Sequence, residues 1–267
     1  MKTKEKFYRP LISAYRRKKA QHLSSQVREC IQHCQDPIPV ILISYNNGVY
    51  TENMVNQLAV FNIKPIIIDN NSTDQKTLST LNKIKQSNLA QIAFSNKNFG
   101  HMVGFLEPIY EVLPETFAYS DPDLKLNRNL PKNFIQELAR LTEMYHVFKA
   151  GLALEIPEDE NIIDANYPIK STKPFKFKRF FSIKEYEGRY WRKQLQHDKL
   201  TIFCAPTDTT FAVYKKSNFE GNFYDAVRVA GNFSAIHLPW FPDLDILNQE
   251  EKDSYLIGNR STTWVKN

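Results

Sequence analysis

The sequence predicts an α/β fold in which a mostly parallel sheet is flanked by helices. Three short apolar runs, each ending abruptly in polar residues, alternate with stretches of helical periodicity between residues 40 and 101. Continuous apolar runs are typical of parallel strands that are buried on both faces. Strands that alternate with helices over so short a stretch predict right-handed crossovers and hence one parallel sheet.

The predicted strands end in polar side chains that belong to one edge of the sheet. The runs are 40–44, 65–69 and 90–94, and helical spacing over 51–62 and 77–85 separates them. Ligands of open α/β sheets bind at the carboxyl ends of the strands. The polar residues after each run are therefore expected to line one crevice.

A fourth apolar run, Phe117–Tyr119, ends in Ser120-Asp121-Pro122-Asp123. Two carboxylates spaced i, i+2 around a proline, which limits local flexibility, suit a hard divalent cation that bridges the phosphates of a nucleotide diphosphate. The alternative for so short a motif is a turn of good turn-forming residues after a buried strand. The three upstream strand ends favour the metal site, because they converge on the same edge.

Composition limits the classes of function. The chain has 267 residues, a formal net charge of +6 and a pI of about 9.0, which favours an anionic partner such as nucleic acid, nucleotide phosphates or an acidic membrane surface. No apolar run approaches the roughly 18 to 20 residues of a spanning helix, so we expect a cytoplasmic protein. The three cysteines lack zinc-ligand spacing and are expected to be reduced, structural thiols. Neither glycine-rich phosphate loop is present, which disfavours a dinucleotide dehydrogenase or a P-loop enzyme.

Residues 1–36 form a predicted basic helical segment ahead of the α/β domain. Apolar side chains such as Phe7, Leu11 and Leu23 are interleaved with many lysines and arginines. A basic amphipathic helix suits an anionic bilayer surface, which would place the protein at the inner face of the membrane. The alternative is a solvated helix that packs on the domain.

Four motifs, in order along the chain, resemble the GT-A nucleotide-sugar glycosyltransferases, above all the large inverting family 2. The motifs are Pro39–Asn46, Ile66–Asp74, Asn96–His101 and Tyr119–Asp123. The resemblance implies a GT-A (Rossmann-like) domain over residues 37–267. Its first half, 37–124, would bind the nucleotide sugar, and its second half, 125–267, would bind the acceptor.

The resemblance also implies roles in donor binding. Tyr45 or Asn46 would face the nucleotide base, and Asp69 would accept a hydrogen bond from a uracil ring. A polar turn whose side chains satisfy backbone groups is the alternative for Asp69. The residues expected near the ribose and the diphosphate are Asn98, Gly100 and His101. Asp121 and Asp123 would match the family's DxD motif, with Asp123 the more direct ligand of Mn²⁺ or Mg²⁺ and Asp121 nearer the ribose and a metal-bound water.

The second half gives fewer signals. Inverting transfer needs a carboxylate within hydrogen-bond reach of the acceptor hydroxyl. Asp208, in a polar turn before an apolar strand, is the first candidate, and Asp225 is the second because the Glu-Asp pair expected in family 2 is missing here. His237 is expected to join the metal site, with a structural histidine as the alternative. Arg228 is expected to neutralise the diphosphate.

Residues 131–145 predict a helix and 149–156 another strand. Residues 157–200 form a predicted insertion rich in basic and aromatic side chains, including Lys173–Phe181. We expect an acceptor-binding lid in which Trp191 contacts a sugar; the alternative is a core aromatic that anchors the lid. Alternating cations and aromatic rings also suit nucleic acid, which the context makes a less favoured partner.

These features predict an inverting, metal-dependent glycosyltransferase that moves a hexosyl or N-acetylhexosaminyl group. The donor would be a UDP-sugar, and the acceptor a hydroxyl of a glycan or lipid-linked glycan. A nucleotidyltransferase shares the sheet and the carboxylates, but its glycine-rich, basic signature is missing after the first strand. A nucleic-acid-binding module that uses the basic segments is the other alternative.

Overall fold

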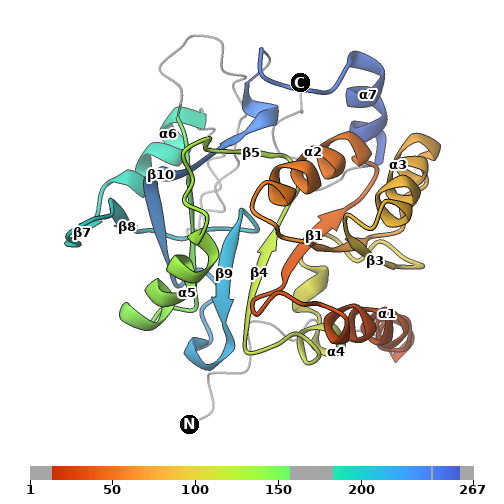
Figure 1. The fold of residues 1–267 in the computed structure, drawn as a ribbon, viewed down its shortest axis with the longest axis horizontal. Helices are drawn as coiled ribbons and strands as arrows, with labels where there is room; N and C mark the ends of the chain where they lie inside the picture. The colour runs from red at the N-terminus through yellow and green to blue at the C-terminus, as the bar shows by residue number, and fades with distance from the viewer. Residues whose placement is uncertain (1–13, 157–182, 242, 259–267) are drawn as a thin grey trace, which may run out of the picture.

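The computed structural model describes residues 14–156, 183–241 and 243–258 (Figure 1). The predicted segment Lys173–Phe181 and the first thirteen residues, with Phe7 and Leu11, lie outside the described residues. In the part that is described, ten strands form one sheet with helices on both of its faces. This arrangement confirms the predicted α/β fold class.

The sheet order is β3-β2-β1-β4-β9-β6-β10-β8-β7, and β5 also pairs with β10. The strands are β1 (Val40–Ser44), β2 (Ile66–Asp69), β3 (Gln91–Phe94), β4 (Thr116–Ser120), β5 (Leu124–Leu126), β6 (Lys149–Leu154), β7 (Gln194–Leu195), β8 (Ile202–Cys204), β9 (Ala212–Lys215) and β10 (Ala226–His237). Strands β1 to β4 are mutually parallel, and β6 and β10 are also parallel to each other. Because β9 pairs antiparallel with both β4 and β6, all six of these strands run in the same direction. Their carboxyl ends therefore meet at one edge.

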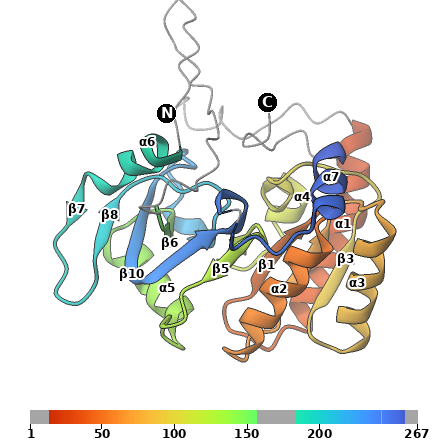
Figure 2. The same cartoon turned by 90° about the horizontal axis from the view of Figure 1, so that it is seen from above.

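The α-helices among the described residues are α1 (Ala14–Gln32), α2 (Gly48–Ala59), α3 (Gln75–Gln86), α4 (Glu107–Tyr110), α5 (Phe134–Met144), α6 (Ile183–Gly188) and α7 (Gln249–Gly258). Helices α2, α3 and α5 cover one face of the sheet, and α1 and α4 cover the other (Figure 2). Side chains of a strand alternate between faces. Accordingly, Leu42 packs in the core between the sheet and helices α2, α3 and α5, whereas Ile41 and Ile43 pack in the core between the sheet and helices α1 and α4.

Helix α1 belongs to the predicted basic N-terminal segment. Its buried Leu23 and Val27 pack in the same core cluster as Ile41 of β1. The Gln26 side chain also bonds the backbone of Phe94, its amide donating to the carbonyl (2.9 Å) and its oxygen accepting from the N–H (3.0 Å). The apolar face of α1 therefore packs on the domain over these residues. None of the described helices is long and apolar enough to cross a membrane.

The second half differs most from what the sequence indicates. The predicted helix 131–145 is α5, and the predicted strand 149–156 is β6, each within a few residues. The twelve-residue strand β10 was not predicted, because the exposed Gly231 and Asn232 interrupt its apolar pattern. At this point the register of its pairing with β6 also shifts, between Val229 and Ser234. It nevertheless delivers His237 to the carboxyl edge of the sheet.

Candidate functional site

The strand ends of the first half meet at one edge, as predicted. In the sheet register Ser44 of β1 lies beside Asp69 of β2, and Asp69 lies beside Phe94 of β3. On the other side of β1, Leu42 pairs with Ser120, so β4 ends at nearly the same level. The loops that follow these strands form the floor of the candidate site.

Asn46 ties the first two of these loops together. Its backbone has a left-handed φ of +48°. Its side-chain oxygen accepts the N–H groups of Thr73 (2.8 Å) and Asp74 (3.1 Å), and its own N–H donates to the Ser72 hydroxyl (2.9 Å). Because these bonds use the Asn46 amide, Tyr45, which is half-buried beside it, is the better placed of the two candidates to meet a nucleotide base.

Asp69 is buried at the end of β2. Its carboxylate accepts hydrogen bonds from the Ser72 backbone N–H (3.1 Å) and the Ser72 hydroxyl. Burial raises the pKa of Asp69 above its ordinary value, and the two bonds to Ser72 oppose that rise. Such bonds are the ones expected if Asp69 belongs to a polar turn whose side chains satisfy backbone groups. A carboxylate has about four lone-pair sites, so a uracil N–H remains compatible with them.

The loop after β3 is held by Asn70, which the sequence reasoning did not single out. The Asn70 side chain accepts from the Phe99 N–H (2.8 Å) and donates to the Gly100 carbonyl (2.9 Å). Asn98 accepts from the Gly100 N–H (2.8 Å), and Gly100 has a φ of +87°, which favours glycine. The exposed side chain of His101 follows, with its carbonyl fixed by the Tyr119 hydroxyl (2.6 Å).

Asp123 and His237 meet at the centre of this edge. An oxygen of the buried Asp123 carboxylate lies 3.3 Å from His237 Nε2. The pair is held in place because β5 and β10 align Leu124 with His237 and because the Leu238 N–H donates to the Asp123 carbonyl (2.9 Å). The Trp240 ring packs on His237 at 4.5 Å between centroids. The sequence therefore identified two residues that the fold brings together across 114 positions.

The Asp123 carboxylate fits a metal ion. Its other oxygen, Oδ1, is buried and has no hydrogen-bond partner in the described part of the chain. A buried polar atom without a partner is costly, and a bound cation would satisfy it. Among the described residues no three acidic, histidine or cysteine side chains cluster as a metal site. Asp123 and His237 would thus share a metal with ligands from a bound nucleotide, as Mg²⁺ and Mn²⁺ sites commonly do.

Asp121 faces a different neighbour from Asp123. Its carboxylate accepts a hydrogen bond from the Thr209 hydroxyl, and its N–H donates to the Thr209 carbonyl (3.0 Å). Burial, followed by repulsion from Asp123, raises the pKa of Asp121 well above the usual value. The negative charge of Asp208, whose side chain is exposed, adds to the rise in the pKa of Asp121. Thr209, whose hydroxyl fixes Asp121, was missed by the sequence reasoning.

Comparisons with known proteins find similarity among solved structures. No family model and no curated protein matches the sequence. Among solved structures, residues 1–349 of TarS from S. aureus match at 15% identity and a TM-score of 0.36, over 67% of this chain and 46% of that one. Mannosyltransferase PcManGT from Pyrobaculum calidifontis, in complex with GDP-Man and Mn²⁺, matches at 11% identity and a TM-score of 0.44. The match covers 86% of this chain and 67% of that one.

The chain spans less than half of the TarS chain that it matches, and about two thirds of the mannosyltransferase.

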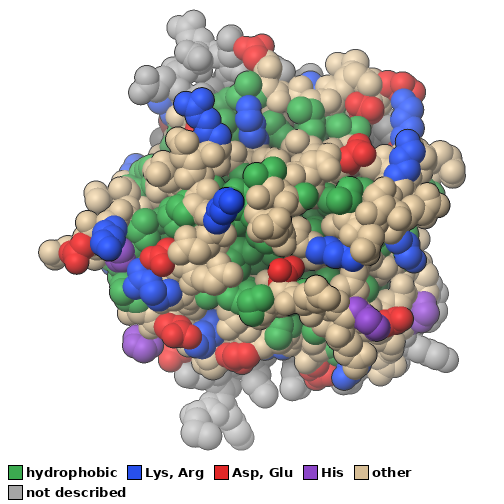
Figure 3. All heavy atoms as spheres, in the orientation of Figure 1, with side chains coloured by type: hydrophobic (Ala, Val, Ile, Leu, Met, Phe, Trp, Pro, Cys, Tyr) green, Lys and Arg blue, Asp and Glu red, His purple; other side chains and the backbone are tan. Residues whose placement is uncertain are grey.

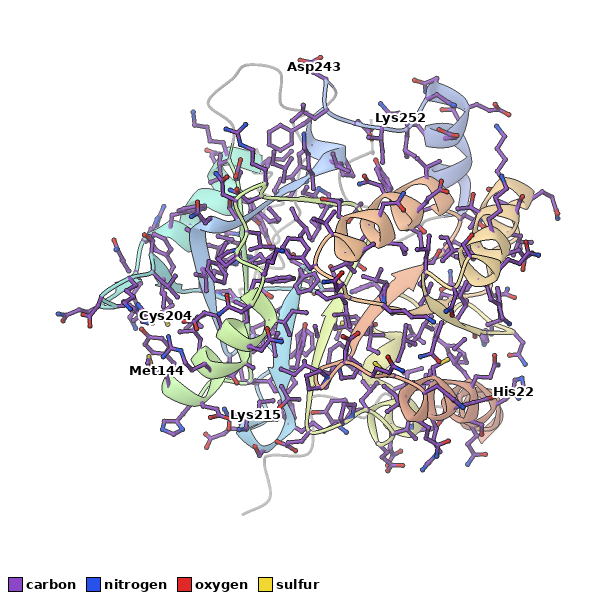
Figure 4. All side chains as sticks on the ribbon, in the orientation of Figure 1. His22, Met144, Cys204, Lys215, Asp243 and Lys252 are labelled. Atoms are coloured by element: carbon purple, nitrogen blue, oxygen red, sulfur yellow. The ribbon has the colours of Figure 1, made fainter. Side chains whose placement is uncertain are left out.

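The structure does not bring Asp225 into the site. Asp225 precedes β10 and accepts a hydrogen bond from the Phe148 N–H (3.2 Å), just before β6 begins. The backbone N–H of Lys215, a residue labelled at the lower edge of the sheet in Figure 4, donates to the Phe148 carbonyl (2.9 Å). Asp225 therefore lies at the amino ends of the parallel strands, opposite Asp121 and Asp123.

Arg228 is engaged elsewhere as well. Its guanidinium forms a buried ion pair with Glu187 of α6 (2.7 Å), donates to the Pro206 carbonyl (2.7 Å) and stacks over the Tyr190 ring. This geometry corrects the expectation that Arg228 faces a diphosphate, because Glu187 already neutralises its charge. Trp191 is half-buried and packs on Phe203 at 5.2 Å between centroids, as expected for the anchoring alternative.

Proposed function

We propose that the chain is an inverting, metal-dependent glycosyltransferase that moves a hexosyl or N-acetylhexosaminyl group from a UDP-sugar to a hydroxyl of a glycan or lipid-linked glycan. The observation that carries the proposal is the buried Asp123 carboxylate, with one oxygen beside His237 and the other without a hydrogen-bond partner among the described residues. It lies where open α/β sheets bind their ligands. The Mn²⁺ in the Pyrobaculum mannosyltransferase complex is in keeping with such a site.

The donor would lie along the loops that follow β1, β2 and β3. Tyr45 and Asp69 would contact the nucleotide base, and the loop with Asn98, Gly100 and His101 would lie beside the ribose and diphosphate. Mn²⁺ or Mg²⁺ would be held by Asp123 and His237, with Asp121 toward the ribose and a metal-bound water. When bound, the metal offsets the negative charge that develops on the departing nucleoside diphosphate.

Asp208 would act as the general base. Its side chain is exposed, whereas its backbone is anchored next to Thr209, the partner of Asp121. In direct displacement the acceptor oxygen bonds to the anomeric carbon while its proton passes to Asp208, and the bond from that carbon to the diphosphate oxygen breaks. The attack comes from the face opposite the leaving group, so the configuration of the sugar inverts.

A nucleic-acid-binding module finds less support. The face in Figure 3 shows Lys and Arg side chains of the described residues scattered among acidic ones, without a continuous basic stripe. Binding to an anionic membrane surface would depend on the N-terminal residues outside the described part of the chain. A nucleotidyltransferase would use the same carboxylates and is separated by its product.

The test is the variant Asp123→Asn, assayed for release of UDP from a panel of UDP-sugars. We expect turnover with Mn²⁺ to fall by about 1,000-fold, equivalent to about 4 kcal/mol of transition-state stabilisation. Saturable quenching of Trp240 fluorescence by Mn²⁺ should also disappear, since the indole packs on His237. Transfer that persists in Asp123→Asn, or in the wild-type protein with chelator, would refute the proposal. Release of pyrophosphate from a nucleoside triphosphate would instead favour the nucleotidyltransferase.

Asp245→Asn is the matched control. Asp245 is also a buried carboxylate, but it is paired with Lys252 (3.1 Å) and with the Tyr50 hydroxyl (2.6 Å). It lies outside the proposed metal site. Its variant should keep the Mn²⁺ response and the turnover of the wild-type protein, even if it is less stable.

A further inference from the structure

The segment between β8 and β9, residues 205–211, packs against β6 of the sheet. It carries Asp208 and Thr209. At Gly151 of β6, an added Cβ would come within 3.1 Å of the Thr207 methyl group and of the Phe211 carbonyl. The segment therefore packs tightly against β6. Its path depends on the side chains of β6 and of the strand beside it.

One of these strands presents a buried lysine. Lys149, the first residue of β6, has no exposed surface, and its ammonium donates to the Asp208 carbonyl (3.2 Å). The ammonium also lies 3.7 Å from the centroid of the Phe223 ring, a cation–π contact. Burial lowers the pKa of Lys149 to about 7, and the charge of Asp208 opposes this shift. The lysine is thus kept in a costly environment beside the proposed base.

The next strand presents a buried arginine. Arg228 of β10 donates from Nε to the Pro206 carbonyl (2.7 Å) and from Nη1 to Glu187 (2.7 Å), and both charged side chains are almost fully buried. Two cations from two adjacent strands therefore bind carbonyls two residues apart in one segment. At its other end the segment is bonded to Asp121 through Thr209.

We propose that Lys149 and Arg228 are positioning residues that hold the backbone of residues 205–209 and thereby set the Asp208 carboxylate relative to Asp121. The inference rests on the proposed function, in which Asp208 meets the acceptor. Buried charged groups are weak contributors to stability, and apolar replacements of similar volume are often neutral or stabilising. Their presence under this segment is explained by the placement of Asp208, because small displacements of a catalytic group cost large factors in rate.

The first test is Lys149→Met, which keeps the volume and removes the donor. Amide hydrogen exchange of residues 205–211 should become faster, while exchange in β1 and β2 stays unchanged. We expect kcat to fall by about 100-fold. KM for the UDP-sugar and the Mn²⁺ response of Trp240 should stay unchanged, because the donor half is untouched. A lysine with a merely structural role would not separate kcat from KM in this way.

Lys216→Met is the matched control. Lys216 also donates to backbone carbonyls, those of Tyr110 and Leu113, and lies over the Tyr110 ring, but it follows β9 at the opposite edge of the sheet. Its variant should leave kcat and the exchange of residues 205–211 as in the wild-type protein. An equal fall in kcat in both variants would overturn the proposal.

The second test is the double variant Arg228→Met/Glu187→Met, which removes both members of the buried ion pair and leaves no unpaired charge. It should reproduce the faster exchange and the selective loss of kcat. If Lys149→Met does not fold, this variant decides the question; if neither folds, both residues are structural and the proposal fails. Hydrogen exchange also separates the two hypotheses, because a wild-type protein without transferase activity would refute the proposed function while the exchange of residues 205–211 still tests positioning.

Discussion

The two halves of the domain build their parts of the site differently. In residues 37–124 the side chains at the strand ends bond to loops close in sequence, as Asn46 does with Thr73, 27 positions away. In the second half the corresponding bonds connect distant segments: Thr209 reaches Asp121 over 88 positions, and Lys149 reaches Asp208 over 59. The first half, which we propose binds the donor, is therefore a set of local motifs, whereas the second half, which we propose binds the acceptor, depends on how the strands pair.

The largest expected effect distinguishes between the two candidate general bases, Asp208 and Asp225. Asp208→Asn removes the carboxylate that we propose takes the proton from the sugar acceptor's hydroxyl, so we expect kcat to fall by about 100- to 10,000-fold. KM for the UDP-sugar should change little, because the donor loops are intact. The exposed side chain should make the free energy of unfolding nearly the same as in the wild-type protein. Steady-state kinetics and urea denaturation measure both quantities.

Asp225→Asn is expected to show the opposite pattern. Its carboxylate bonds the Phe148 N–H at the far edge of the sheet, so the variant should lose about 1 kcal/mol of unfolding free energy and keep its kcat. A larger kcat loss in Asp225→Asn than in Asp208→Asn would reverse the assignment. It would also break the comparison, because the base would then lie outside the edge where the donor motifs converge.

The same difference explains how far the sequence could predict the site. The strand ends at Asn46, Asp69 and Asp121 were predictable because each follows an apolar run directly. His237 could be predicted only through the family resemblance, yet the structure places it beside Asp123. The partner of Arg228 was not predictable, because Glu187 comes from a short helix far away in sequence and nothing local signals their pairing.

Lys149 shows a signal that was present but not used. A lysine that opens the otherwise apolar run of β6 is unusual, since such a position is buried in a parallel strand. The pattern predicted the strand correctly. It did not indicate that the ammonium would meet the backbone of residues 205–209, because that segment reaches β6 only through the antiparallel strand β9.

The next effect in size concerns stability and pH. The pKa of Lys149 is about 7 in the folded protein and about 10.4 in an unfolded chain, so between these values the unfolded state binds more protons. The free energy of unfolding should therefore rise with pH from about 7 to about 10. Lys149→Met should lack this rise and should be the more stable protein below pH 7, by up to a few kcal/mol.

Urea denaturation of both proteins at pH 6, 8 and 9.5 measures the difference. The comparison of the two proteins isolates the contribution of Lys149 to the pH dependence, because all other titratable groups are present in both. Equal pH dependence in the two proteins would show that the ammonium is not buried as described. A Lys149→Met protein that is more stable but slower would show that the acceptor half trades stability for the placement of Asp208.

The smallest effect tests a segment that crosses from one half to the other. After His237 the chain returns to α2, where Leu238 and Leu247 pack on the buried Tyr50, and the Tyr50 hydroxyl donates to Asp245 (2.6 Å). Lys252, labelled on α7 in Figure 4, pairs with the same carboxylate (3.1 Å). Tyr50→Phe should lower the free energy of unfolding by about 1 kcal/mol and Tm by about 2 to 4 °C.

Lys252→Met is the comparison for that variant. Its ammonium is partly exposed, so removing it should cost less than about 1 kcal/mol, whereas Tyr50→Phe removes a bond inside the core. Both variants should keep kcat, since neither side chain is among those proposed to hold the metal or the donor. If Tyr50→Phe instead weakens the Mn²⁺ response of Trp240, the returning segment must help to hold His237, and the donor half would then depend on long-range packing as much as the acceptor half does.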